Sequence, residues 1–318
     1  MRVELFTTSS ALPSLIEGNS FHSAWMFRLI EQHTEARPLM LAAYDDEGEQ
    51  GHLLAVKNRE LRLLPPGIHT WYSIYGEGVY SPRCTNRQEI FALLLKKLYT
   101  LFDFTHTMIE VRNLSNQSFA YGALSGMNFF PRRSIRVYLS LHGNQHTKRL
   151  ARTYRTYIRK AQSRGVTFGE ATDAQEIASA LGMLRLYYIS KIKRHLPPTS
   201  YLKALLAEER ARMFVVRYKG RPIGCSICLY ESGRAHLAYS FGLRKSHPLL
   251  YPGIMAVWAA ITDAHSRGID HFEFLELGTA GKGYRNFILN FGGKQISTYH
   301  WQHYKWGWIN KIMRRIYV

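Results

Sequence analysis

An internal repeat is the feature of this sequence that most restricts how the chain can fold. The stretch MLAAYDDEGEQGHLLAV begins at Met40, and the similar stretch MFVVRYKGRPIGCSICL begins at Met213. Each has a short apolar run, a polar turn, a glycine eleven residues from its start (Gly51 and Gly224) and a second apolar run. Apolar runs joined by a polar, glycine-containing turn are typical of β-hairpins. The repetition predicts two copies of one folding unit.

The segments around the two hairpins also repeat, in the same order. Helical patterns flank each hairpin, over residues 20–33 and 86–104 in the first copy and over 201–210 and 251–267 in the second. In both copies the second helix is followed by a strand, a short helix and a final strand. This order predicts a mixed α/β fold, and 318 residues are enough for two domains. We expect the first domain over residues 1–145 and the second over residues 167–318.

A strongly basic segment lies between the two copies. The stretch KRLARTYRTYIRKAQSRGVTF, residues 148–168, has seven basic residues and no acidic one. Its apolar and basic residues recur at helical spacing on nearly opposite sides, so we expect a linking helix over residues 146–166. Solvated helix faces usually mix both signs of charge. Arg152, Arg155 and Arg159 are therefore our candidates for phosphate contacts, with a solvated face as the alternative.

The overall charge favours anionic partners. The chain has 42 Lys and Arg against 23 Asp and Glu, a net charge of +19, which suits nucleic acid, an anionic membrane surface or phosphate-bearing substrates. The sequence shows neither a signal peptide nor an apolar run of about 18 residues, so we expect a cytoplasmic protein. Cys225 and Cys228 lie in an apolar run, which favours burial over zinc or redox chemistry. We expect no metal site.

Four phrases of the sequence are diagnostic in their order. They are SFHSAWMFRLIE from Ser20, RTYRTYIRKAQSRGV from Arg152, YKGRPIGCSICLY from Tyr218 and GTAGKGYRNFILNFGGK from Gly278. Together they resemble the FemAB-like transferases, in which two GNAT-fold domains follow each other in one chain. The sequence departs from such proteins in two ways. It lacks the coiled-coil arm of some members, and its counterpart of the CoA diphosphate loop, LRKSHPLLYPGIMAVW, has only one glycine, Gly253.

The resemblance implies an acyltransferase with two tandem GNAT-like domains joined by the basic helix. Members of the family usually transfer an aminoacyl group from a charged tRNA to an amine of a cell-wall precursor, whereas related GNAT proteins use acetyl-CoA and some relatives acylate sugars. We therefore expect aminoacyl-tRNA as donor, a cell-wall or glycan precursor as acceptor and no tightly bound cofactor. An acyl-CoA-dependent enzyme of polysaccharide biosynthesis is the alternative. A non-catalytic protein that binds nucleic acid or a membrane surface is an alternative of another class.

The strand-like stretch DHFEFLELG is the expected place of catalysis. Acyl transfer to an amine requires a proton acceptor, and Glu276 ends this stretch beside aromatic residues and a glycine-rich loop. A carboxylate in such surroundings is expected to have a raised pKa, which suits proton acceptance. We expect Glu276 to be the catalytic base, with an exposed strand-end glutamate as the alternative. Glu273 and His271 are expected to be structural.

The stretch after Glu276 offers further candidates. A loop with three glycines and Lys282 precedes a helical segment, a context that suits phosphate binding, although a plain strand–helix turn fits equally. Tyr284 and Arg285 match the aromatic–basic pair of the family, which implies substrate contact. Lys294 follows a Gly-Gly turn and is a candidate for contact with a phosphate backbone, with a solvated hairpin as the alternative.

The first copy offers one candidate substrate surface. Phe21, Trp25 and Arg28 follow each other at steps of four and three, so they share one face of the expected helix. An aromatic–arginine face suits a sugar–phosphate group. Packing in the core, with the arginine reaching solvent, is the alternative.

The C-terminal stretch YHWQHYKWGWINKIMRRIYV, from Tyr299, interleaves aromatic and basic residues. This composition suits peripheral contact with a membrane interface. The alternative is a last strand and helix that pack on the domain. Both interpretations hold together if one face of the segment packs on the domain and the opposite face contacts the membrane.

Overall fold

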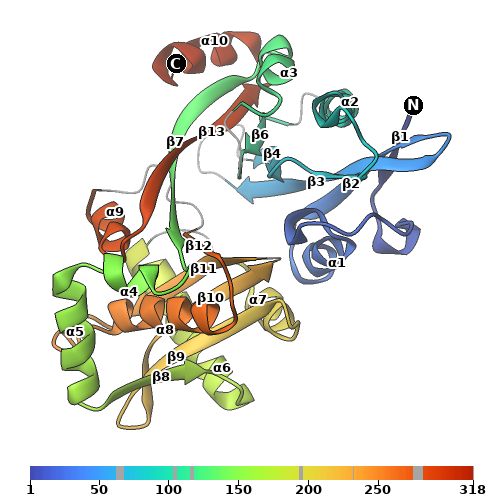
Figure 1. Cartoon of the computed structure of the whole chain (residues 1–318). Coiled ribbons are helices and arrows are strands. Elements are labelled where there is room, and N and C mark those ends of the chain that lie inside the picture. Colours follow the sequence, from blue (N-terminus) through green and yellow to red (C-terminus); the bar gives the residue numbers. More distant parts are fainter. Residues whose placement is uncertain are drawn as a thin grey trace. The chain divides into compact units, whose positions relative to one another are not determined.

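The computed structural model describes residues 1–61, 68–102, 106–114, 118–192, 196–231, 233–274 and 282–317 (Figure 1). The chain forms two compact units, one of Met1–Ser134 with Ser297–Val318 and one of Ile135–Ile296. Each unit combines a β-sheet with packed helices. The predicted mixed α/β class is therefore confirmed.

The first unit has the strand order β1-β2-β3-β4-β6-β13. Its elements are β1 (Arg2–Phe6), α1 (Ala24–His33), β2 (Arg37–Asp45), β3 (Gly48–Leu61), β4 (Ile68–Tyr75), β5 (Val79–Tyr80), α2 (Arg87–Thr100), β6 (Met108–Arg112), α3 (Tyr121–Gly126), β13 (Lys294–Tyr304) and α10 (Gly307–Tyr317). Neighbouring strands in this order are antiparallel, except that β4 and β6 run parallel. Helix α2 packs its apolar side, including Phe91 and Leu94, into the core of this unit.

The second unit has the strand order β7-β12-β11-β10-β9-β8. Its elements are β7 (Phe130–Ser140), α4 (Gln145–Arg149), α5 (Arg152–Ser163), β8 (Val166–Glu170), α6 (Ala174–Tyr187), a π-helical turn (Tyr188–Ile192), α7 (Thr199–Leu206), β9 (Ala211–Tyr218), β10 (Arg221–Glu231), β11 (Arg234–Gly242), α8 (Pro252–Ser266), β12 (His271–Phe274) and α9 (Lys282–Leu289). Again one pair, β11 and β12, is parallel and the others are antiparallel. Helix α8 is almost wholly apolar and lies in the core.

The two units share one topology. The hairpin β2–β3 corresponds to β9–β10, helix α2 to α8, and the parallel pair β4–β6 to β11–β12. The internal repeat that the sequence predicts is therefore present as a duplicated fold. The predicted domain boundaries, at residue 145 and residue 166, stay a prediction. The two compact units are defined by contacts in space, so their limits do not test boundaries that were defined by the sequence repeat.

The final strands of the two copies are exchanged, which the sequence did not predict. Strand β7 follows α3 of the first copy, but its residues Val137–Ser140 pair with β12 in the second unit. Strand β13 follows α9 of the second copy, but His300–Tyr304 pair with β6 in the first unit. Apolar alternation shows that a segment is a strand and which side faces the core, but does not identify its partner. This exchange is why residues 297–318 belong to the first unit.

The basic segment is not one continuous helix. We expected a helix over residues 146–166, and the structure has α4 and α5 with a break at Leu150 and Ala151. At the break the N–H of Ala151 donates to the carbonyl of Asn290 at 2.9 Å. Gly292, with φ of +91°, lies so close that a Cβ there would be 2.7 Å from the backbone of Arg149. This contact with the Phe-Gly-Gly turn holds the backbone out of the helical path.

The C-x-x-C pair lies inside strand β10. Cys225 and Cys228 are fully buried, and burial raises the pKa of both thiols, so they stay protonated and unreactive at neutral pH. Among the described residues, no helix is long and apolar enough to cross a membrane.

Helix α8 approaches the strands beneath it at very short range. A Cβ on Gly242 would lie 2.2 Å from the backbone nitrogen of Gly253. A Cβ on Gly224 would lie 3.1 Å from the carbonyl oxygen of Pro252 in α8 and 2.9 Å from that of Phe241 in the neighbouring strand β11. Contacts this short with backbone atoms are not relieved by a side-chain rotation, so both strand positions require glycine. The first turn of α8 therefore sits on the end of β11.

We predict that Gly242→Ala lowers the free energy of unfolding by about 2–4 kcal/mol, because the methyl group forces α8 away from the sheet. Urea unfolding followed by circular dichroism measures the change. Gly182→Ala is the matched control, since Gly182 is exposed within α6 and its Cβ would meet open space. The control should leave stability unchanged or raise it by up to about 1 kcal/mol. Equal stability of the two variants would contradict the prediction.

Candidate functional site

The N-terminus of α8 is the feature of the second unit best suited to bind an anion. Tyr251 precedes the helix with φ of +49°, no side chain caps the helix, and the first turn has no acidic residue. Pro252 has no N–H, so the first free donors are the backbone N–H groups of Gly253 and Ile254. The helix dipole adds partial positive charge at this end.

A β-bulge lies in the strand that leads to this helix. In the pairing of β10 with β11, Ile227 is opposite Tyr239 and Cys228 is opposite Leu237, so Ala238 is the extra residue. The described pairing of β11 with β12 covers only Arg234–Leu237, and β11 continues past it to Gly242. Bulges redirect backbone and side-chain groups and are frequent beside active sites. The bulge and the start of α8 thus belong to one continuous segment, in which strand β11 is followed by a loop and then by the helix.

The basic helix α5 packs on the loop that opens α8. The ring of Tyr157 stacks on that of Tyr251, with centroids 4.2 Å apart and planes 12° apart. The guanidinium of Arg164, just after α5, donates to the carbonyl of Leu249 at 2.6 Å. Another loop residue, Arg244, lies close enough to Tyr154 to act on its pKa, although burial dominates and raises the pKa of Tyr154 to about 12. Helix α5 is therefore part of the surroundings of the α8 N-terminus.

The structure confirms the two sides predicted for this helix. Tyr154, Ile158 and Ala161 are buried. Arg152, Arg155 and Arg159 are exposed, and Arg155 also donates to the carbonyl of Leu150. From Arg152 to Arg159 the helical rise amounts to about 10 Å. The exposed row is therefore longer than a single diphosphate group.

A buried ionic cluster occupies the other side of the sheet from α8. Phe272 and Phe274 of β12 lie in the core with α8, and Glu273 between them faces away and is 6% exposed. Its carboxylate accepts a hydrogen bond from Arg136 and lies 3.5 Å from Arg234 and 3.7 Å from the Nδ1 atom of His236. Phe272 and Phe274 thus face one side of the sheet and Glu273 the other, where its carboxylate lies near three basic side chains.

The remaining candidates of the second unit are separate from this cluster in the described residues. Glu276 lies outside the described residues, as do Gly278 and Gly281 of the glycine-rich loop. Lys282 opens helix α9. Further along α9, Tyr284 is exposed and stacks on Phe287, and Arg285 is half-buried. Lys294 is exposed at the start of β13.

In the first unit the predicted aromatic–arginine face is divided. Phe21 lies in a 3-10 turn, and α1 begins only after Ser23, whose hydroxyl accepts from the N–H of Met26. Trp25 is half-buried and Arg28 is exposed on α1. Phe21 stacks on Tyr75 of β4, with ring centroids 6.3 Å apart. Phe21 is therefore the member of this group that meets the sheet.

Tyr75, on which Phe21 stacks, belongs to a second buried glutamate cluster, which was not predicted from the sequence. Arg112 of β6 donates to Glu110 at 2.9 Å and to the hydroxyl of Tyr75 at 2.9 Å, and Glu110 is 6% exposed. Glu110 occupies the same position in β6 as Glu273 in β12. Each of these strands follows the helix that connects two parallel strands of its sheet, α2 in the first unit and α8 in the second; we call these the crossing helices. The repeated strands TMIEVRN and HFEFLEL carried this signal, since both have a glutamate between two core residues.

The two crossing helices differ at their N-termini. In the first unit the side chain of Asn86 accepts a hydrogen bond from the N–H of Glu89, and Glu89 places a negative charge in the first turn of α2. Helix α8 has neither feature. Of these two helix starts, that of α8 is therefore the one better suited to an anion.

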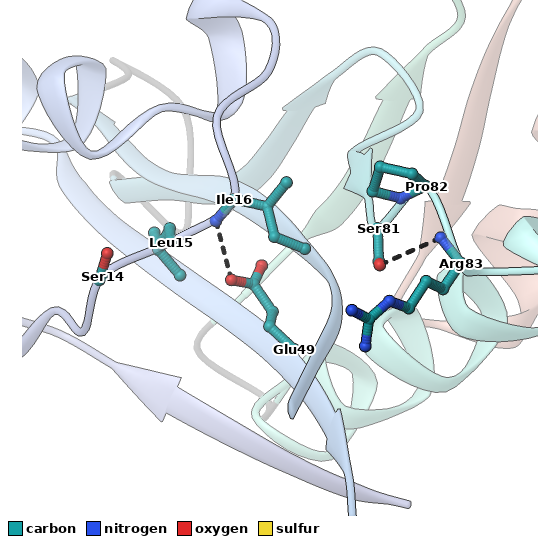
Figure 2. Close-up of a pocket in the computed structure, with 7 residues that line it drawn as sticks. All are labelled: Ser14, Leu15, Ile16, Glu49, Ser81, Pro82 and Arg83. Carbon is teal, nitrogen blue, oxygen red and sulfur yellow. Dashed lines mark hydrogen bonds between the residues drawn. The ribbon is translucent and has the colours of Figure 1, made fainter. Parts of the chain in front are cut away.

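A shallow pocket of about 490 Å³ lies elsewhere in the first unit (Figure 2). Figure 2 shows the Glu49 side chain at its wall, where one oxygen accepts from the N–H of Ile16 at 2.9 Å. The other oxygen lies 2.5 Å from Nδ1 of His52. Arg83 and Ser81 line the opposite side. None of the residues predicted from the sequence lines this pocket, and both oxygens of its carboxylate already have partners.

His300 gives the Glu110 cluster a testable pH dependence. Burial, helped by Arg112 and Arg132, lowers the pKa of His300 to about 4, although Glu110 acts in the opposite direction. Between about pH 6.5 and 4 the unfolded chain therefore binds a proton that the folded chain does not, so stability falls as pH decreases through this range. Above about pH 6.5 His300 is neutral in both states and costs no stability. At pH 4 the difference in protonation lowers the free energy of unfolding by about 3 kcal/mol.

We predict that His300→Gln flattens the decline of unfolding free energy between pH 6.5 and 4 relative to the unchanged protein. Urea unfolding at a series of pH values measures the difference between the two proteins, so that titrating carboxylates common to both cancel. Parallel pH profiles would show that His300 is protonated equally in both states.

The comparisons with known proteins agree with this fold. Residues 148–286 match the family described as Acetyltransferase (GNAT) domain, which covers most of the second unit. No curated protein sequence matches the chain significantly. The solved structure of FemX has 12% sequence identity and a TM-score of 0.68, with 99% of each chain covered.

Two further solved structures extend the comparison. The C-terminal domain of a putative lysylphosphatidylglycerol synthetase from Agrobacterium fabrum has 10% identity and a TM-score of 0.59, with 92% of this chain and 90% of that chain covered. A tandem GNAT protein from the clavulanic acid biosynthesis pathway has 11% identity and a TM-score of 0.55, with 95% and 98% covered. At such identities the likeness concerns the fold. The chain therefore has the fold of these tandem GNAT structures, and residues 148–286 in its second copy match the acetyltransferase (GNAT) domain family.

Proposed function

We propose that the second unit binds a phosphate-bearing acyl donor at the N-terminus of α8 and transfers its acyl group to an amine. The observation that carries this proposal is the uncapped start of α8, with helix α5 packed against it through Tyr157 and Arg164. Exposed backbone N–H groups and basic side chains together suit a phosphate group. The capped start of α2, with Glu89, argues against a donor site in the first copy.

A charged tRNA is the donor that these residues favour. The row from Arg152 to Arg159 extends about 10 Å, which suits neighbouring phosphates of a polynucleotide better than one diphosphate. Only two backbone N–H groups are free at the start of α8, fewer than the glycine-rich loops that bind a diphosphate closely. The FemAB-like fold supports an aminoacyl group as the cargo and an amine of a cell-wall or glycan precursor as the acceptor.

In the proposed reaction the neutral acceptor amine attacks the carbonyl carbon of the aminoacyl ester. Glu276 accepts the proton that the acceptor ammonium loses, the new C–N bond forms, and the C–O bond to the ribose breaks with a proton passing to the leaving oxygen. Tyr284 and Arg285 are proposed to contact the acceptor. Phe21, Trp25 and Arg28 of the first copy are proposed separately as a substrate-binding surface of the first unit. Lys282 and Lys294 are proposed to contact donor phosphates.

Acyl-CoA is the second candidate donor, because the matched family is the acetyltransferase (GNAT) domain and a β-bulge at Ala238 lies in the strand that leads to α8. Calorimetric titration separates the two donors. Micromolar binding of acetyl-CoA would favour the CoA-dependent reaction, whereas binding of charged tRNA without heat from acetyl-CoA would favour the proposed one. Binding of neither would contradict a donor site at α8.

We predict that Arg159→Glu weakens binding of charged tRNA by about tenfold, because it replaces one phosphate contact with a repulsive charge. Arg159 is exposed on α5, so the fold should be unaffected. Filter binding at fixed ionic strength measures the affinity. Lys203→Glu, the same charge change at an exposed position of α7, is the control and should bind like the unchanged protein. Equal losses in the two variants would show that only net charge matters.

We predict that Glu276→Gln lowers the rate of acyl transfer by at least about 100-fold while donor binding stays unchanged, because the amide does not accept the proton. Single-turnover transfer of a radiolabelled aminoacyl group measures the rate. A non-catalytic binding protein predicts no effect of this change. A normal rate together with normal binding would place the proton acceptor elsewhere.

A further inference from the structure

Several polar contacts attach helix α10 to the first unit. The buried amide of Asn310 accepts from the N–H of Tyr304 at 3.1 Å and donates to the carbonyl of Asn128 at 2.9 Å. Arg314 donates to the carbonyl of Phe129 at 3.4 Å, and Tyr317 lies under the guanidinium of Arg132 at 4.7 Å. These contacts define the inner side of the helix.

The opposite side of α10 is apolar and exposed. Trp308, Ile312 and Ile316 follow each other at steps of four residues, so they form one line along the helix. Their exposed fractions are 65%, 48% and 63%. A helix that covers a globular core normally turns such a stripe inward. Here the polar residue Asn310 is buried and the stripe, which we call the outer stripe, is exposed. Helix α10 itself lies at the periphery of the first unit (Figure 1).

The charges beside the outer stripe have one sign. Lys311 and Arg315 are exposed and alternate with the stripe residues along the same side of the helix. The chain has no Asp or Glu after Glu276. Apolar residues flanked by basic ones are the pattern of helices that lie in the interface of an anionic bilayer. The helix rises about 16 Å, roughly half of a hydrocarbon core of about 30 Å, so it suits the plane of the interface.

We propose that the outer stripe of α10 inserts into the headgroup region of an anionic lipid bilayer and holds the protein at the membrane surface. Charge complementarity selects this partner. In a second copy of this chain the facing Lys311 and Arg315 would repel each other, and a nucleic acid does not require three exposed apolar side chains. The inference goes beyond the proposed acyl transfer, since lipid binding needs neither donor nor acceptor.

The test is flotation of the full-length protein with vesicles of phosphatidylcholine alone and with about 30% phosphatidylglycerol. We expect the protein to float with the anionic vesicles and to stay at the bottom with the neutral ones. The double variant Trp308→Ser with Ile316→Ser should bind the anionic vesicles about tenfold more weakly, because it removes two of the three inserting side chains. Lys311→Gln with Arg315→Gln should also weaken binding, and added salt should weaken it further.

The matched control is Leu186→Ser with Ile189→Ser in the second unit, where the two aliphatic side chains are 69% and 63% exposed. This control should float like the unchanged protein, and circular dichroism should show all variants folded, since each changed side chain is exposed. Equal flotation with neutral vesicles, or full flotation of the Trp308 and Ile316 variant, would overturn the proposal. A dimer in light scattering that this variant dissociates would assign the stripe to a second copy instead. Flotation is scored without any acyl donor, so failure of the proposed reaction leaves this result unaffected.

Discussion

The close approach of α8 to strands β10 and β11 determines the geometry of the second unit. Because Gly224 and Gly242 carry no side chain, the helix begins directly at the end of β11, and its first turn is held in place by backbone contacts. The loop before it is then fixed to α5 by the stacking of Tyr157 on Tyr251. A positive helix end and a basic helix are thereby brought together by ring stacking, backbone packing and the hydrogen bond from Arg164 to the carbonyl of Leu249. The position of the candidate donor site is a consequence of these contacts.

Comparison of the two copies separates features of the fold from features of the site. Glu110 and Glu273 occupy corresponding positions and both are buried beside an arginine, and a feature common to both copies is best explained by the fold. A buried carboxylate with such partners fixes the neighbouring strands, and removal of one partner is costly. The helix starts differ instead, since Asn86 caps α2 and no side chain caps α8. A difference of this kind is expected if the second copy binds the donor, as we propose, and the first copy does not.

The sequence was sufficient for the elements but not for their partners. Apolar periodicity predicted both hairpins, both crossing helices and the buried and exposed sides of α5, because burial leaves a local pattern. It did not predict that β7 and β13 exchange places, since pairing depends on distant residues with the same alternation. It also placed Phe21 on a helix that begins three residues later, because Ser23 caps the helix and spacing alone does not show a cap. Glu110 was missed, although the repeat places it at the position in the first copy that corresponds to Glu273 in the second.

The exchanged strands explain why the two copies remain in one chain and why the C-terminal helix can serve the first unit. Each sheet would end in an unpaired edge at β6 or β12 if its own copy were alone, and an open edge favours aggregation. Strand β13 closes the edge of the first unit with His300–Tyr304, and α10 follows it directly, so the helix is carried to the first unit by the strand. The outer stripe thus belongs to the first unit, whereas the candidate donor site depends on the core of the second unit. Because the side chains of the stripe are exposed and take no part in either core, packing does not restrict their chemistry, and they suit the membrane contact that we propose.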